Sequence, residues 1–380
     1  MSQPRFFEYL QNNSPELVIV KDAKAASSLS DVAKFLKKDV LVFPDLRAVS
    51  GDDLRSFKSE LFELFTALNV YEHCVKKPMI ISPIKTLSHY LPKAELCQRR
   101  FLEFGQSIEL EPFKKEMLCW GYSFVDIVEE KGEISFRGDI IDIFPIQADK
   151  PYRISLFGDE IEEIRAFELE TQKSIKEEIE SIEIIPAFFA LNEAQYDTLV
   201  QRCESSSYDS FVKDINSLGL WHLQEWASPF MEGKHAIYSE DLSLELQEIY
   251  AFDESAVDEE HFDLNIMPLE QVCSPFVFID LQKSLEVHGK KKITIIASNE
   301  AQVKQFELFN TTALNIIYAP WVVNIVSEDE LILSLNKEVK KKRRKKTSII
   351  LDELKPGDYV VHEDYGVGVF EKIEQAEILG

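Results

Sequence analysis

Residues 1–104 alternate between short apolar runs and segments whose apolar residues recur with helical spacing. The apolar runs predict buried strands at 17–20, 39–43 and 79–82. The helical spacing predicts helices at 4–11, 28–36, 52–68 and 84–91. Because strands and helices alternate, we expect a parallel sheet that is covered by helices.

Residues 120–167 alternate apolar and polar positions with a period of two, the pattern of strands that bury one face. The pattern predicts strands at 122–128, 133–144, 152–157 and 160–167. The short connections between them predict an antiparallel sheet. The alternation changes phase after Gly138, which predicts a β-bulge at that glycine.

One face of this predicted sheet carries three candidate binding residues. Tyr152 and Leu156 are expected to point into the core, so that Arg153 and Phe157 point outward, and Arg137 shares their face. Arginine beside an exposed aromatic is typical of protein-binding hot spots. The alternative is that a helix covers Phe157 and that both arginines pair with nearby acidic residues, since many sheets have two covered faces.

A family resemblance is carried by two runs, GYSFVDIVEEKGEISFRGDIIDIFP and PYRISLFGDEIEEIRAFELETQKS. They resemble the domain shared by the excision-repair protein UvrB and the transcription-repair coupling factors, the Mfd family. The resemblance implies that this domain binds UvrA. It also implies that Arg137, Arg153 and Phe157 lie at positions used for that contact.

The loop after the first predicted strand, residues 21–28, reads KDAKAASS and contains no glycine. A phosphate-binding loop needs glycines and Gly-Lys-Ser/Thr there, because its backbone amides surround the phosphates. In the resembled families UvrB keeps such a loop and the coupling factors have lost it, which favours the coupling factors. Residues 348–353 have the apolar-then-Asp-Glu form of a magnesium motif, but we interpret them as a linker strand.

The middle of the chain offers no catalytic pattern. Residues 189–264 predict helices at 192–203, 208–215 and 242–249 and a strand at 235–238. The aromatic segment 219–230 is interpreted as part of the hydrophobic core, and the alternative is a binding stripe. Residues 265–335 predict a small α/β unit with strands at 292–297, 314–318 and 322–325 and helices at 299–309 and 328–333. Ser298 is the expected N-cap of the first of these helices. Histidines and cysteines lack metal-ligand spacing.

A basic cluster follows at residues 340–346. Its candidate phosphate-binding residues, which could instead contact acidic surfaces of the same chain, are Lys341, Lys342, Arg343, Arg344 and Lys345. The alternative is a solvated linker.

Residues 354–370 read LKPGDYVVHEDYGVGVF, which predicts strands at 359–362 and 369–373 joined by a glycine turn. The string resembles the start of the RNA-polymerase-interacting domain of the coupling factors, also found in CarD-type transcription regulators. It implies the opening hairpin of an SH3-like barrel. The sequence stops before such a barrel closes, so we expect a piece of a longer protein.

Composition narrows the function further. A net charge of -25 disfavours broad binding to nucleic acid. No apolar run approaches the roughly 20 residues of a membrane span. Five scattered cysteines without a C-x-x-C pair favour reduced thiols and a cytoplasmic location.

We therefore predict a multidomain α/β chain. Its expected parts are a UvrB-like parallel domain without a phosphate loop (1–104 and 189–264), an inserted antiparallel UvrA-binding domain (105–188), a small α/β domain (265–335), a basic linker (336–353) and the start of a polymerase-interacting domain (354–380).

The resemblance implies transcription-coupled repair. RNA polymerase stalled at a DNA lesion is recognised, with its β subunit as the expected contact, and is released by ATP-driven translocation on DNA, after which UvrA is recruited for nucleotide excision repair. ATP and magnesium belong to motor domains beyond residue 380, so this fragment is expected to be non-catalytic. The alternatives are a UvrB-like ATPase with a divergent nucleotide site and a CarD-type regulator without a repair role.

Overall fold

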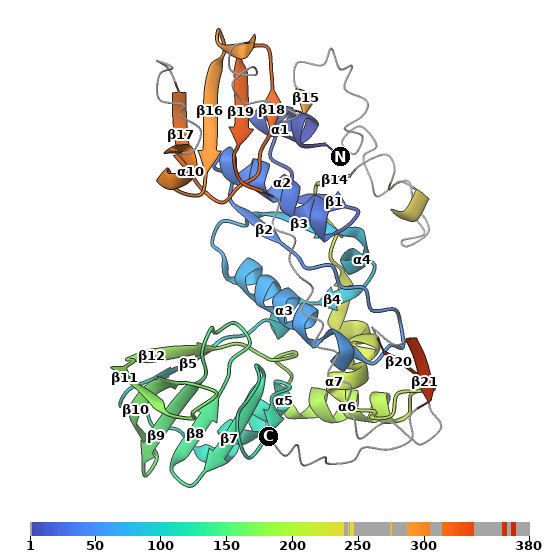
Figure 1. The fold of residues 1–380 in the computed structure, drawn as a ribbon. Coiled ribbons are helices and arrows are strands. Elements are labelled where there is room, and N and C mark those ends of the chain that lie inside the picture. Colours follow the sequence, from blue (N-terminus) through green and yellow to red (C-terminus); the bar gives the residue numbers. More distant parts are fainter. Residues whose placement is uncertain are drawn as a thin grey trace. The chain divides into compact units, whose positions relative to one another are not determined.

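The computed structural model describes residues 2–238, 242, 244–246, 274–275, 287–304, 314–337, 359–362 and 366–369. The chain divides into two compact units, Met1–Glu338 and Val339–Gly380. Figure 1 shows the fold as a ribbon. The prediction of a mixed α/β chain with separate parallel and antiparallel sheets is confirmed.

The first sheet is parallel and has the strand order β14-β1-β3-β2. Its strands are β1 (Leu17–Val20), β2 (Val40–Val42), β3 (Met79–Pro83) and β14 (Ala236–Ile237). All four residues of β1 are buried, as expected for a parallel strand covered on both faces. Since β14 follows the second sheet in sequence, the chain leaves the parallel sheet after β3 and returns to it with β14.

Helices cover both faces of this sheet (Figure 1). They are α1 (Gln3–Asn12), α2 (Ala23–Phe35), the 3-10 turn η1 (Leu54–Phe57), α3 (Lys58–His73) and α4 (Ile84–Leu87). Val18 and Val20 face the core formed with α1 and α2, while Leu17 and Ile19 face the core formed with α3.

Several predicted helix bounds were wrong. The helix predicted at 28–36 begins at Ala23, because Asp22 already caps it. The helix predicted at 52–68 is split into η1 and α3. The helix predicted at 84–91 ends at Leu87 and is followed by β4 (Tyr90–Pro92), which pairs with β13 (Ala227–Pro229).

The second sheet has six strands in the order β11-β10-β9-β8-β7-β6. They are β6 (Ser123–Phe124), β7 (Glu133–Arg137), β8 (Ile140–Ile143), β9 (Tyr152–Phe157), β10 (Glu160–Phe167) and β11 (Ser174–Glu178). A separate ladder joins β5 (Arg100–Glu103) to β12 (Ser181–Ile184). Helix α5 (Leu110–Cys119) adds Phe113 and Met117 to the core shared with Ile134 and Ile154.

Two predictions about this sheet are corrected. The single strand predicted at 133–144 is a hairpin, β7 and β8, whose turn is Gly138-Asp139. The φ of Gly138 is +59°, so the glycine permits a tight turn rather than a bulge. The strand predicted at 122–128 is reduced to β6, and it runs parallel to β7 although we expected an antiparallel neighbour.

The chain then forms short elements before it re-enters the first sheet. They are α6 (Glu193–Glu204), α7 (Ile215–Leu218) and the 3-10 turns η3 (Gly219–His222) and η4 (Gln224–Trp226). The helix predicted at 208–215 is wrong, since residues 208–214 form bends and irregular chain and helix α7 begins only at Ile215. The aromatic segment 219–230 packs on the core through Leu220, Leu223 and Phe230, which confirms its structural interpretation.

A five-stranded sheet in the order β15-β18-β19-β16-β17 completes the described part of the first unit. It contains β15 (Ser274–Pro275), β16 (Lys292–Ala297), β17 (Leu314–Tyr318), β18 (Ile325–Val326) and β19 (Glu330–Ser334), with helix α10 (Glu300–Lys304). The helix predicted at 328–333 is wrong, because strand β19 lies there. The bounds of the strand predicted at 322–325 are also wrong, because β18 begins at Ile325 and ends at Val326. Asn299, and not Ser298, accepts the hydrogen bond of the Gln302 amide.

The second unit contains an antiparallel hairpin of β20 (Tyr359–His362) and β21 (Gly366–Val369). The first predicted strand is confirmed, but the second starts at Gly366 rather than at residue 369. The basic residues Lys341–Lys345 and the segment 348–353 lie outside the described residues. Among the described residues, no helix has the length and apolar character that crossing a membrane requires.

Candidate protein-binding site

The candidate site lies on the face of the six-stranded sheet opposite α5. Strand register places Ser135, Asp142 and Arg153 directly across from one another on β7, β8 and β9. Directly opposed residues on neighbouring strands point to the same face. The next row on the same face, by the same register, contains Arg137, Ile140 and Ser155.

One buried carboxylate holds both candidate arginines. Asp142 has no exposed side-chain surface, and its Oδ1 and Oδ2 accept hydrogen bonds from Arg153 Nε and Nη2 at 2.7 and 2.8 Å. Arg137 Nη2 donates a further hydrogen bond to Asp142 Oδ2. A bidentate guanidinium–carboxylate pair fixes orientation as well as distance.

Arg153 is held on every side. Its Nη1 donates to the backbone carbonyl of Gln172 at 3.1 Å, and its guanidinium carbon lies 4.9 Å from the centre of the Phe167 ring. Only 19% of its side chain is exposed. The hydrogen bonds to Asp142 raise the pKa of Arg153, so its charge is permanent. Arg153 is thus a packed side chain that presents a narrow edge to solvent.

Arg137 and Phe157 are the exposed members of the predicted trio. The Arg137 side chain is 47% exposed, and Phe157 is 78% exposed at the end of β9, beside the turn at Gly158. None of the helices in the described part of the chain covers Phe157, which contradicts that part of the alternative interpretation. The other part is confirmed, because both arginines do pair with an acidic residue.

The end of this face that carries Ser135 is covered by neighbouring segments of the chain. Ser135 Oγ donates to the backbone carbonyl of Asp126 at 2.9 Å, and Gln172 Nε2 donates to that of Val128 at 3.2 Å. Val128 and Phe167 also belong to a small buried cluster at that end. The accessible part of the face is therefore the end that carries Arg137 and Phe157.

Asp142 and Ile140 were not predicted as members of the site. Both lie in the strand that follows the hairpin turn at Gly138, which we had interpreted as a bulge. The signal was present, because an aspartate inside the apolar run IIDIF needs a charged partner when it is buried. The identity of that partner depends on strand register, which the sequence alone does not reveal.

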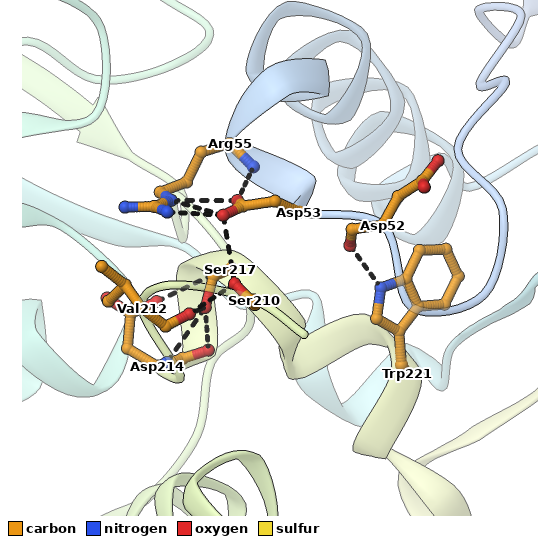
Figure 2. A network of polar contacts seen from close by, with 8 residues as sticks. All are labelled: Asp52, Asp53, Arg55, Ser210, Val212, Asp214, Ser217 and Trp221. Carbon is orange, nitrogen blue, oxygen red and sulfur yellow. Dashed lines mark hydrogen bonds and ion pairs between the residues drawn. The ribbon is translucent and has the colours of Figure 1, made fainter. Parts of the chain in front are cut away.

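A second polar network joins two distant segments and has a structural role (Figure 2). Asp53 pairs with Arg55 and accepts a hydrogen bond from Ser210 Oγ at 3.1 Å. Trp221 Nε1 donates to the backbone carbonyl of Asp52 at 2.9 Å. Burial alone would raise the pKa of Asp53, but the hydrogen bonds from Arg55 and Ser210 leave it below its usual range. The network ties η1 to the segment around α7.

Where a phosphate-binding loop would lie, a backbone amide is already hydrogen-bonded to a side chain of the same chain. Strand β1 ends at Val20 and helix α2 begins at Ala23, and the Asp22 carboxylate accepts a hydrogen bond from the Ala25 amide at 2.9 Å. A bound phosphate would need such N-terminal amides. Within the described ranges, no group of three or more histidine, cysteine, aspartate or glutamate side chains is arranged to hold a metal ion.

Comparisons with known proteins identify two regions. The family model described as the UvrB interaction domain matches residues 101–188, and the one described as the CarD-like/TRCF RID domain matches residues 354–380. Transcription-repair-coupling factors of Helicobacter pylori strains J99 and 26695 are each 35% identical over 374 residues, which are 96% of this chain. One from Haemophilus influenzae is 31% identical over 180 residues, 47% of this chain and 16% of that relative. The chain spans 37% of the length of the Helicobacter relatives.

Proposed function

We propose that this chain, which belongs to the family of the transcription-repair-coupling factors, recruits UvrA through the exposed end of its six-stranded sheet. The observation that carries the proposal is the placement of Arg137 and Phe157. Both are exposed, they share one face, and they lie within the residues that match the UvrB interaction domain. An arginine and an aromatic on an uncovered sheet face have the composition of a binding hot spot.

The proposal for the whole protein is transcription-coupled DNA repair. We propose that it recognises RNA polymerase stalled at a lesion, through the β subunit, and releases it by ATP-dependent translocation on DNA. Recruitment of UvrA then starts nucleotide excision repair. The names of the relatives and the CarD-like match at residues 354–380 support this proposal. ATP, magnesium and DNA would bind to motor domains beyond this chain, whose own role is recruitment without catalysis.

Finer features of the fold are proposed on the same basis. The parallel sheet is a degenerate relative of phosphate-loop sheets, in which the Asp22 cap stands where a phosphate would bind. The hairpin β20–β21 is the opening of an SH3-like barrel of the CarD type. For residues Lys341–Lys345, which lie outside the described residues, we propose a contact with phosphates or with acidic surfaces of the same chain. The described cysteines are unpaired thiols, which supports a cytoplasmic location.

The test is binding of the 380-residue chain to purified UvrA, measured by isothermal titration. Arg137→Ala should weaken binding because it removes an exposed hot-spot guanidinium. Arg47→Ala is the matched control, since its side chain is also 47% exposed and also pairs with an aspartate, Asp45. A hot-spot loss of about 2 kcal/mol corresponds to roughly thirtyfold in Kd. Binding of RNA polymerase without any binding of UvrA would overturn the proposal in favour of a transcription regulator.

A further inference from the structure

We propose that Asp142 is a positioning residue of the UvrA-binding face, which holds Arg137 in the conformation that meets the partner while Arg153 supports it from behind. The inference rests on the proposed function and deepens it. It assigns different roles to two arginines that the sequence presents as equivalent.

Asp142 lies beneath the surface of this sheet face and affects binding only through the two arginines. Its side chain is fully buried, so it does not contact a partner itself. Its two oxygens accept three hydrogen bonds from two guanidinium groups. A carboxylate removed from water is stable only when it is paired and hydrogen-bonded, and the two arginines meet this need. Asp142 and the arginines therefore fix one another.

Each nitrogen of the Arg153 guanidinium group already donates a hydrogen bond within the chain, so few donors remain for a partner. Its Nε and Nη2 are used by Asp142, its Nη1 donates to the Gln172 carbonyl, and one face of its guanidinium lies on Phe167. Its contribution is to hold Asp142 in place. A lysine at this position would keep the positive charge but would lose the planar, bidentate contact.

Arg137 is arranged in the opposite way. Among the interactions of the described residues, only its Nη2 has a partner, so Nε and Nη1 remain for a bound protein. Arg137, Arg153 and Asp142 together carry one net positive charge, and the neighbouring Arg165 is already paired with Glu163 and Glu178. The chemistry fits a partner surface that places a carboxylate opposite Arg137 and an apolar recess opposite Phe157.

Fixing Arg137 before binding lowers the entropic cost of association. An arginine that must be ordered on binding costs a few-fold to about tenfold in Kd. Asp142→Asn keeps the shape of the side chain but replaces one acceptor oxygen by a donor amide and removes the charge. Both arginines would then lose the charged contact and share a single acceptor oxygen, and we expect UvrA to bind about tenfold more weakly.

A double-mutant cycle with the 380-residue chain and UvrA tests this role. Asp142→Asn should weaken binding about tenfold in the wild-type background, and by less than about twofold when Arg137→Ala is already present. In the Phe157→Ala background the full effect should remain. Asp53→Asn is the control, because it makes the same change in an arginine pair outside the sheet, and it should leave the Kd unchanged.

Folding of each variant is checked by far-UV circular dichroism. If Asp142→Asn does not fold, Arg153→Lys takes its place in the same cycle, with a several-fold loss expected that disappears beside Arg137→Ala. Equal losses in both backgrounds would show a merely structural role, and tighter binding would show that Asp142 competes with the partner. Either result overturns the inference and leaves the proposed function intact. Absence of wild-type binding overturns both.

Discussion

Replacing Arg153 by alanine should destabilise the six-stranded sheet far more than replacing Arg137, although both arginines bind the same carboxylate. Arg153 gives Asp142 two hydrogen bonds and is 19% exposed, whereas Arg137 gives it one hydrogen bond and is 47% exposed. Hydrogen bonds to charged groups contribute about 1.5–3 kcal/mol when buried, and exposed ion pairs about 0–1 kcal/mol. We therefore expect losses of about 2–3 kcal/mol for Arg153→Ala and under about 1 kcal/mol for Arg137→Ala.

The assay must report on the sheet alone, because a chain of several parts does not unfold in one two-state step. Native-state hydrogen exchange of the backbone amides in β8 and β9 gives the free energy of local opening. Arg47→Ala is the control, and it should leave those amides unchanged. Equal losses for the two arginines, or a larger loss for Arg137→Ala, would refute the reasoning from burial.

Three further predictions concern other parts of the chain. The pKa of Asp53 is lowered in the folded protein, so its contribution to stability is present above the unfolded pKa of about 3.9 and is lost as the pH falls through the folded pKa. Asp53→Asn should therefore make the melting temperature depend less on pH in the acid range. Gly121→Ala should lower the melting temperature strongly, since Gly121 has φ +81° and an added Cβ would lie 2.5 Å from Phe188 Cβ. Burial raises the pKa of the Cys97 thiol to about 12, so in the native protein at pH 8 iodoacetamide should label Cys74 before Cys97, as mass spectrometry of peptides can show. Unchanged acid profiles, an unaffected melting temperature or preferential labelling of Cys97 would contradict these predictions in turn.

The parts of the site that depend on local alternation were predictable. A period of two along β9 is sufficient to bury Ile154 and Leu156 and to expose Phe157 beside the turn. Arg137 and Arg153 were placed on the same face for the same reason. Asp142 was missed because its partners are set by the pairing of β8 with β7 and β9, and that pairing requires the turn at Gly138 to be identified correctly.

Tertiary contacts explain the errors elsewhere in the fold. The segment EDELILS mixes acidic residues with leucines in a way that suits a short helix, but Leu331 and Leu333 are buried in a strand that pairs with β16. Pairing in the sheet overrides a weak local preference. The strand predicted at 235–238 was assigned to the parallel domain, but its position beside β1 is a long-range contact that the sequence does not specify.

Recruitment of UvrA by this sheet face is tested most directly by the Kd of UvrA for Phe157→Ala, compared with Phe211→Ala. Both phenylalanines are highly exposed, at 78% and 73%, but only Phe157 lies on the proposed binding face. We predict that Phe157→Ala weakens binding at least roughly thirtyfold, and that Phe211→Ala leaves it at the wild-type value. Equal Kd values for the two variants would contradict the claim that this face of the sheet recruits UvrA.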